Sequence, residues 1–277
     1  MPFKTHRTAR PRSIAAACAL GAAAALMLIT GVTSADAAAG RLKKETASPR
    51  KIFYAGKREA VFKYEISQKA DIEIAAVRKG DGAIKKWHRQ DVTPDKVHKL
   101  KWDGTLGKHR AAPKGEYHWR VKANGHKLDR SHAHGDPHFG VYPDKFPVRG
   151  HHGYGDGWDA GRGHQGQDVF AACGTKLEAA RAGRVAKIGN NRGGWGHYLV
   201  INTKGEHRAH LYAHLKHRPT VHRGQRVHTG DKVGLVGHSG NAQGCHLHFE
   251  YWKGRYGSGG HATAAVTKKL KAWDRWS

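Results

Sequence analysis

The stretch Gly244-Cys245-His246-Leu247-His248-Phe249-Glu250, near the C-terminus, is the most informative part of this chain. Polar and apolar residues alternate along it, and residues two apart in a strand point to the same side. We therefore expect a strand with His246, His248 and Glu250 on one side and Leu247, Phe249 and Tyr251 on the other. Two imidazoles on one side of a rigid strand can bind a metal ion and transfer protons.

Histidine is so abundant here that the pattern alone is weak evidence. The chain has 23 histidines in 277 residues, so about two His-x-His pairs are expected by chance, and short motifs carry that risk. A second pair does occur, at His132 and His134. The spacing His-x-x-x-Asp occurs three times, at His132/Asp136, His152/Asp156 and His164/Asp168. The surrounding sequence has to distinguish these candidates.

The His164/Asp168 pair has the most favourable surroundings. Asp168 leads directly into the apolar run 169–172, which predicts a strand and hence the rigid support that a metal site requires. The other two pairs lie in a glycine-dense run, 153–155, which predicts a loop, and in a polar linker that contains Gly and Pro. We expect the linker histidines to be solvated.

A third histidine segment reads His210-Leu211-Tyr212-Ala213-His214-Leu215. A helix would place His210 and His214 on one metal-binding face. The apolar run 198–201 and a predicted hairpin turn at Gly205 favour a strand instead. In a strand, His210, Tyr212 and His214 share one side.

The first 37 residues predict an export signal, with a basic start, an Ala-rich apolar run at 14–32 and a small-x-small cleavage site at 35–37. The alternative is a retained membrane anchor. The formal charge is +27, and removing four basic residues and one acid leaves +24. Such a chain should seek polyanions, for an exported protein anionic wall polymers, although a general solubilising charge is an alternative. A nucleic-acid partner is disfavoured by export and by the scarcity of a basic and aromatic stacking pattern.

Two cysteines, Cys173 and Cys245, remain after cleavage at residue 37. Export favours a disulfide between them, and this bridge would tie the His164/Asp168 segment to the His246/His248 segment. Two buried free thiols are the alternative.

The mature chain is long enough for two domains. Short alternating runs separated by Gly, Pro and Asp predict an all-β protein, mainly antiparallel, with a small N-terminal β-sandwich and a C-terminal β domain. Trp102-Asp103-Gly104 followed by Gly115-Glu116-Tyr117 resembles the Ig-like or fibronectin-like module of many secreted bacterial proteins. The expected segments are a signal peptide (1–37), the Ig-like module (50–128), a linker (129–145), the second domain (146–252) and a Gly-rich segment with a short helix (253–277).

Four segments together resemble the lysostaphin-type (LytM-like) zinc endopeptidases of bacterial cell walls, over residues of about 146–252. They are His164-x-x-x-Asp168, Tyr212-Ala213-His214-Leu215, Gly237-His238-Ser239-Gly240-Asn241 and His246-Leu247-His248-Phe249-Glu250. His197 and His238 depart from the pattern of that family.

The resemblance implies a role for each of five residues. His164, Asp168 and His248 would bind one Zn²⁺, while His214 and His246 would flank it and handle protons. Three protein ligands and one open position suit a catalytic zinc, and two nitrogens with a carboxylate suit its ligand preference. Either histidine could take the proton of the attacking water, and the other would then steady the oxyanion.

The sequence therefore predicts a secreted or wall-associated monomer that hydrolyses peptide bonds in peptidoglycan cross-bridges or stem peptides. After cleavage of the signal we expect no transmembrane segment. The alternative is a non-catalytic wall-binding protein that activates another wall hydrolase.

Overall fold

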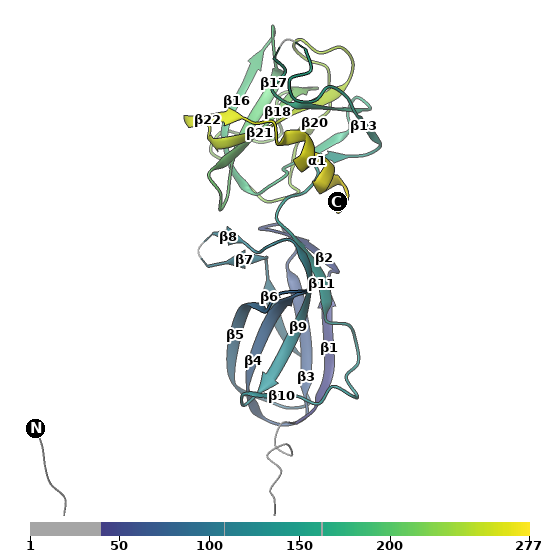
Figure 1. Ribbon diagram of the computed structural model, residues 1–277, viewed down its shortest axis with the longest axis vertical. Helices are drawn as coiled ribbons and strands as arrows, with labels where there is room; N and C mark the ends of the chain where they lie inside the picture. The colour runs from purple at the N-terminus through teal and green to yellow at the C-terminus, as the bar shows by residue number, and fades with distance from the viewer. Residues whose placement is uncertain (1–39, 108, 162) are drawn as a thin grey trace, which may run out of the picture. The chain divides into compact units, whose positions relative to one another are not determined.

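The computed structural model describes residues 40–107, 109–161 and 163–277, and in this part the chain is mainly antiparallel β with one short helix (Figure 1). The predicted fold class is confirmed. The predicted export signal lies outside the described residues. Within the described ranges, no helix is long and apolar enough to cross a membrane.

The N-terminal strands form two principal sheets around one core. One sheet has the order β1-β3-β6 and the other the order β2-β11-β9-β4-β5, with β10 on β9 and a separate β7-β8 hairpin. Only β2 and β11 pair in parallel among these strands. The strands are β1 Leu42–Ser48, β2 Lys51–Phe53, β3 Ala60–Ile66, β4 Ala70–Arg78, β5 Ala83–Val92, β6 His98–Trp102, β7 Thr105–Leu106, β8 Arg110–Ala111, β9 Gly115–Ala123, β10 His126–Lys127 and β11 His138–Tyr142.

Aromatic rings fill this N-terminal core. The Trp119 ring stacks between Phe62 of β3 and Phe139 of β11, at centroid distances of 5.2 and 5.1 Å. The sequence of β3 alternates only loosely in polarity, yet its burial alternates strictly, because the aromatic ring of Tyr64 turns inward. The assignment of this region as an Ig-like module stays a prediction.

Strand β11 lies inside the segment 129–145 that the sequence predicted to be a linker. Its Phe139 and Val141 belong to the N-terminal core. The polar run before it concealed this short strand, so the N-terminal sheets extend beyond residue 128.

The C-terminal strands also form two sheets. One has the order β12-β15-β20, and the other has the order β13-β14-β21-β18-β17-β16-β19, with β22 on β21. The strands are β12 Val148–Arg149, β13 His152–Tyr154, β14 Gln167–Ala171, β15 Lys176–Glu178, β16 Gly183–Asn191, β17 Gly196–Thr203, β18 Arg208–Leu215, β19 Arg226–Val227, β20 Lys232–Leu235, β21 His246–Arg255 and β22 Ser258–Ala262.

Helix α1, Val266–Asp274, closes the C-terminal core with the buried side chains of Val266, Leu270 and Trp273. The sequence predicted a short helix within the segment 253–277. The helix begins only at Val266 because β22 pairs with β21 as far as Ala262, so part of the predicted Gly-rich segment is a strand.

Candidate active site

Strand β21 follows the predicted alternation. Leu247, Phe249 and Tyr251 are buried in the C-terminal core, and the opposite side of the strand carries His246, His248 and Glu250. Strand β14 pairs with β21 so that Asp168 lies opposite His248. Because directly paired residues share a face, the Asp168 carboxylate and the His248 imidazole meet, and Nδ1 of His248 lies 2.9 Å from Oδ1 of Asp168.

His164 reaches the same point from the segment before β14. Its Nε2 lies 2.9 Å from Nδ1 of His248 and 3.2 Å from Oδ1 of Asp168. The three potential ligand atoms thus lie within 4.8 Å of one another. The structure brings together the residues that the sequence predicted as ligands, from segments about eighty positions apart.

Hydrogen bonds on the outer side of each ring select the nitrogen that faces this point. Nδ1 of His164 lies 2.7 Å from the Gly157 carbonyl oxygen, to which it donates, so that Nε2 is free. His248 is oriented the opposite way, since its Nε2 lies 3.1 Å from Oε1 of Glu250 and donates to it, so that Nδ1 faces this point. The donating nitrogens are assigned from the partners of the rings.

The sequence analysis assigned no role to Glu250, although it placed this residue on the same side of the strand as His248. Glu250 is buried, and its second oxygen, Oε2, accepts a hydrogen bond of 2.6 Å from Nε1 of Trp252. A carboxylate fixed in this way holds the His248 ring in one orientation, as partners of metal-binding histidines commonly do.

Gly166 is a second contributor that the sequence analysis missed. A Cβ at this position would lie 2.4 Å from Cε1 of His248. No residue larger than glycine fits at position 166 while the His248 ring lies against it.

His214 departs from the predicted alternation. His210 and Tyr212 face the core, as their pairing with Tyr251 and Phe249 requires. His214 instead has a φ of 58°, in the left-handed region that non-glycine residues rarely adopt. Its ring lies 4.7 Å from the ring of His246 and 5.8 Å from that of His248, between centroids.

The prediction that His210, Tyr212 and His214 share one side is therefore wrong for His214. Backbone strain of this kind is often found at functional sites. A hydrogen bond of 2.8 Å from the His214 amide to the Trp195 carbonyl stabilises this left-handed conformation.

The two flanking histidines have matching orientations. Nδ1 of His214 lies 2.8 Å from the Ser239 carbonyl oxygen, and Nδ1 of His246 lies 3.1 Å from the Gly244 carbonyl oxygen. Each ring donates its Nδ1–H to a backbone carbonyl, so Nε2 is the nitrogen that can accept a proton when the ring is neutral. Nε2 of His246 lies 3.7 Å from Oδ2 of Asp168.

Burial and ion pairing set the charges in this site. Burial favours neutral His248, but hydrogen bonds to Asp168 and Glu250 outweigh it and raise the pKa of the imidazole to about 9. Burial also raises the pKa of Asp168, but the hydrogen bond from His248 brings it below its usual value. Burial lowers the pKa of His214 to about 4, against the effect of the Ser239 carbonyl. A metal ion at Nδ1 of His248 thus has to displace a proton.

The donor set fits a zinc ion. Two imidazole nitrogens and one carboxylate oxygen converge, each ring is oriented by an acceptor behind it, and the side chains are mostly shielded from water. Among the described residues, one other group of His, Cys and acidic side chains is close enough to hold a metal, namely Cys173, His238 and Cys245.

The alternative His-x-x-x-Asp pairs do not form such groups within the described ranges. Nε2 of His152 lies 3.1 Å from Oδ2 of Asp274 in helix α1. The predicted loop around it is the short strand β13, because the segment pairs with β14. His132 is exposed and bonds to the neighbouring Ser131 hydroxyl.

Cys173 follows β14 and Cys245 precedes β21. Their Cα atoms lie 5.3 Å apart, within the range that a disulfide spans. The two segments that carry Asp168 and His248 are therefore close at these positions as well.

Residues 162–262 match the family model described as "Peptidase family M23". This region is an M23 domain. The match covers the whole set of five residues described above.

Two curated relatives of this chain come from bacteria. The M23 domain is similar to the peptidoglycan DD-endopeptidase ShyC of Vibrio cholerae, with 36% identity over 90 residues, which are 32% of this chain and 20% of the relative. An L-Ala--D-Glu endopeptidase of Bacillus subtilis is 31% identical over 169 residues, 54% of this chain and 48% of the relative. The chain thus spans about a fifth to a half of the length of these relatives.

The catalytic domain of lysostaphin from Staphylococcus simulans is a similar solved structure. It has 24% sequence identity and a TM-score of 0.37, and the similarity covers 43% of this chain and 92% of that one.

Proposed function

We propose that this protein is an exported zinc metalloendopeptidase that hydrolyses peptide bonds in peptidoglycan cross-bridges or stem peptides. The observation that carries the proposal is the convergence of Nε2 of His164, Oδ1 of Asp168 and Nδ1 of His248. These atoms would hold one Zn²⁺ and leave a position open. The ion supplies Lewis acidity, which makes hydroxide available near neutral pH and polarises a carbonyl.

His214 and His246 provide the proton transfers. Both rings donate Nδ1–H to a backbone carbonyl, so both present Nε2 toward the site. One of these nitrogens accepts the proton of the attacking water and passes it to the leaving amine as the peptide bond breaks. The other ring, which enters the reaction protonated at Nε2, donates a hydrogen bond to the oxyanion and keeps its proton. No other described acid occupies the base position, because Asp168 contacts His164 and His248, and Glu250 contacts His248 and Trp252.

The substrate class follows from the relatives, which are described as peptidoglycan DD-endopeptidase and L-Ala--D-Glu endopeptidase. The exposed ring of Phe170, 5.4 Å from the ring of His246, supplies an apolar wall for a peptide at this point.

The location and organisation belong to the same proposal. A signal at 1–37 directs export, a Cys173–Cys245 disulfide forms outside the cell, and the protein acts as a monomer at the wall. The N-terminal strands, β1 to β11, are an Ig-like module that positions the M23 domain. The net positive charge retains the protein on anionic wall polymers.

The decisive experiment compares the mature protein with His248→Ala on purified sacculi. We expect the wild type to bind about one zinc ion per chain and to release muropeptides, both measured by mass spectrometry. His248→Ala should lose zinc and release together, whereas the exposed control His222→Ala should keep both. Removal of zinc with a chelator should abolish release, and added zinc should restore it.

Two results would contradict the proposal in different ways. Release by His248→Ala at the rate of the wild type would refute the ligand set. A zinc-loaded wild type that releases no muropeptide, but stimulates another wall hydrolase, would favour the non-catalytic alternative.

A further inference from the structure

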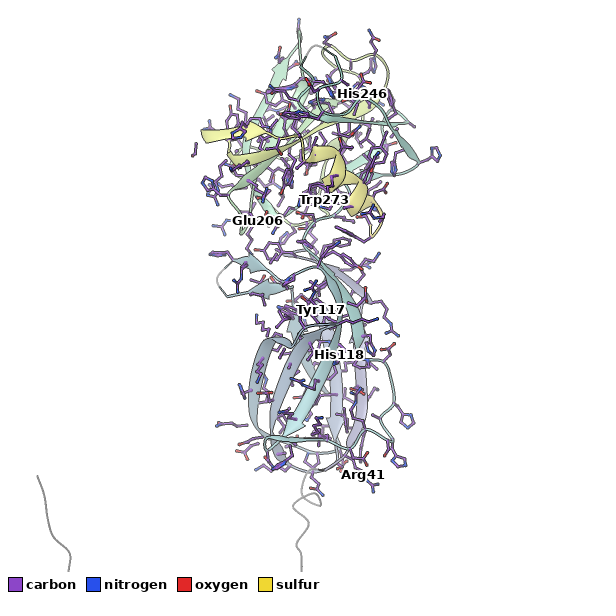
Figure 2. All side chains as sticks on the ribbon, in the orientation of Figure 1. Arg41, Tyr117, His118, Glu206, His246 and Trp273 are labelled. Carbon is purple, nitrogen blue, oxygen red and sulfur yellow. A yellow bond between two sulfur atoms is a disulfide. The ribbon has the colours of Figure 1, made fainter. Side chains whose placement is uncertain are left out.

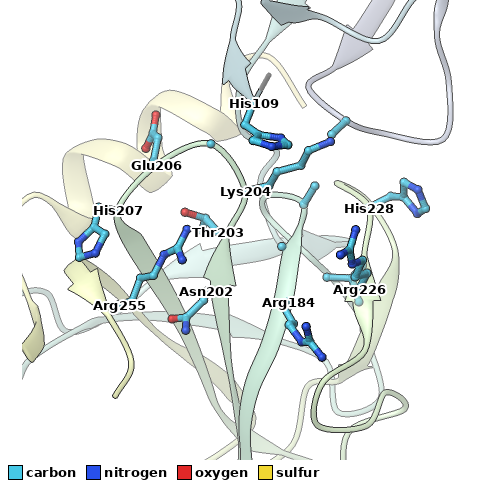
Figure 3. A pocket seen from close by; sticks show the side chains of 15 residues that line it. His109, Arg184, Asn202, Thr203, Lys204, Glu206, His207, Arg226, His228 and Arg255 are labelled. Carbon is cyan, nitrogen blue, oxygen red and sulfur yellow. The ribbon is translucent and has the colours of Figure 1, made fainter. Parts of the chain in front are cut away.

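A basic cavity of about 730 Å³ is lined mainly by residues of the C-terminal sheets, together with Ala55 and His109. One lining residue, Arg255, ends β21, the strand that carries His248 near its start. Figure 3 shows the side chains that line it, among them Arg184, Lys204, Arg226 and Arg255. Glu206 is its one lining carboxylate among the described residues. In Figure 2, Glu206 and His246 lie toward different ends of these sheets, so a ligand held here would not be at the catalytic histidines.

Two of the arginines face each other across paired strands. Arg184 of β16 lies directly opposite Arg226 of β19, and like charges in that position destabilise a sheet. Both side chains are exposed at the cavity. Within the described ranges, neither they nor Arg255 form an ion pair with any acidic side chain. The sheet thus carries an uncompensated repulsion that a bound anion would remove.

Glu206 does not neutralise this cluster. Its Oε1 lies 3.1 Å from Nη1 of the buried Arg181, and its Oε2 lies 2.8 Å from Nε of Arg208. Both oxygens are therefore engaged by cations other than the four that line the cavity. The cavity keeps about four positive charges for a ligand.

Asn202 holds one side of the cavity in place. It lies opposite Arg184 in the sheet, and its Oδ1 accepts a hydrogen bond of 2.9 Å from the Tyr256 amide. Its Nδ2 donates to the Tyr256 carbonyl at 3.3 Å. These two hydrogen bonds fix the turn that follows Arg255. Because Asn202 also pairs with Arg184 in the sheet, the positions of Arg255 and Arg184 are fixed relative to each other.

We propose that this cavity is a binding site for phosphate groups. Guanidinium forks match phosphate oxygens in pairs, and a phosphate brings several acceptor oxygens and up to two negative charges to a single position. A single carboxylate has two oxygens and one charge, which leaves most of these donors unused. The volume suits a small ligand or one segment of a polymer, and the site would hold the protein on a phosphate-bearing surface.

Isothermal titration calorimetry on the mature protein tests this, after chelator treatment so that phosphate cannot bind at a zinc ion. The probes are inorganic phosphate, a poly(glycerol phosphate) chain and, as a carboxylate polymer for comparison, polyglutamate. We expect Arg184→Gln/Arg226→Gln to weaken binding of the polymer by about tenfold or more, since two charge-assisted contacts are lost. The control Lys99→Gln/Lys127→Gln removes the same charge from exposed positions of the N-terminal sheets and should bind like the wild type.

A thermal readout separates binding from misfolding. Phosphate should raise the Tm of the wild type and of the control, because it binds the folded state alone, and should not raise the Tm of the arginine variant. Without phosphate the arginine variant should be at least as stable as the wild type, because the opposed charges are gone. Tighter binding of the polymer than of free phosphate would identify the polymer as the ligand, and the reverse would identify a small phosphate.

Three outcomes would overturn the proposal. The first is that the lysine control binds the phosphate polymer as weakly as the arginine variant does. The second is that the wild type binds polyglutamate as tightly as the phosphate polymer. The third is that the arginine variant binds the phosphate polymer as tightly as the wild type. None of these measurements depends on zinc or hydrolysis, so they can fail while the peptidase proposal stands.

Discussion

At the scale of single residues, Glu250 decides how His248 is presented. It accepts from Nε2 and leaves Nδ1 for a metal ion, while Trp252 holds its other oxygen. It touches no reacting atom in this arrangement, so it is a positioning residue. Its effect should therefore appear in zinc affinity before it appears in chemistry.

We expect Glu250→Leu to weaken zinc binding about 10- to 100-fold, the usual effect of losing a partner behind a ligating histidine. Glu250→Gln keeps an acceptor oxygen, so its zinc affinity should lie between that of the wild type and that of Glu250→Leu. Zinc competition with a chromophoric chelator measures both, and the unfolding midpoint of each variant shows whether the fold is kept. Zinc affinities of the leucine variant and the wild type that coincide would refute this role.

Most of the ligand set could be predicted from sequence, and the reasons are local. Asp168 precedes an apolar run and His248 lies in an alternating one, so the sequence predicted a rigid strand at each, and the family resemblance implied that both are ligands. The position of His214 could not be predicted, because its left-handed backbone occurs at an Ala-His-Leu sequence without glycine. The close approach of Gly166 to His248 was likewise invisible, since it depends on pairing between distant strands.

At the scale of elements, the site depends on the register of β14 and β21. Most strand positions were visible as apolar runs, but the register that sets Asp168 against His248 is a non-local property. Short strands in polar or glycine-rich sequence, such as β11, β13 and β22, could not be predicted. Their pairing partners, rather than their own composition, stabilise them.

The proposed disulfide would fasten these two strands where the site begins. Cys173 and Cys245 are separated by 72 positions, and closing a loop of that length should stabilise the fold by about 4 kcal/mol in the chain-entropy model. We expect Cys173→Ser/Cys245→Ser to lower the free energy of urea unfolding by roughly this amount. Wild type unfolded under reducing conditions is the control and should match the variant. Two free thiols in the oxidised wild type, by thiol titration, would refute the bridge.

At the scale of the whole molecule, the C-terminal core contains a buried cluster of charged and titratable groups. Arg181 is 2% exposed and pairs with Asp144 at 3.0 Å. His210 is fully buried near Arg181, and its ring packs against Phe249 of β21 and Trp273 of α1. Protonation of this cluster therefore acts on the folding of the entire domain.

The two titrating groups respond to pH in opposite directions. Burial, followed by the charges of Arg181 and Arg208, lowers the pKa of His210 from 6.5 to about 3, so stability is full above pH 6.5 and is lost as pH falls toward 3. Burial raises the pKa of Asp144 to about 6, against the attraction of Arg181. The stability that Asp144 contributes is fully present below pH 3.8, the pKa of this group in the unfolded chain, and is lost as pH rises through 6.

Replacing His210 isolates the first effect, because Asp144 titrates in both proteins and its contribution cancels in the comparison. Nδ1 of His210 has no hydrogen-bond partner among the described residues, so His210→Leu leaves no donor or acceptor stranded there. Between pH 7 and about pH 4.5, the variant should gain roughly 2–3 kcal/mol of unfolding free energy relative to wild type. Urea unfolding at the two pH values measures this. As pH falls, unfolding of the wild type lets the His210 ring take up a proton that the buried ring does not bind, and the variant has no such ring. A difference in unfolding free energy between the two proteins that stays constant with pH would therefore mean that His210 is solvated or charged in the folded protein.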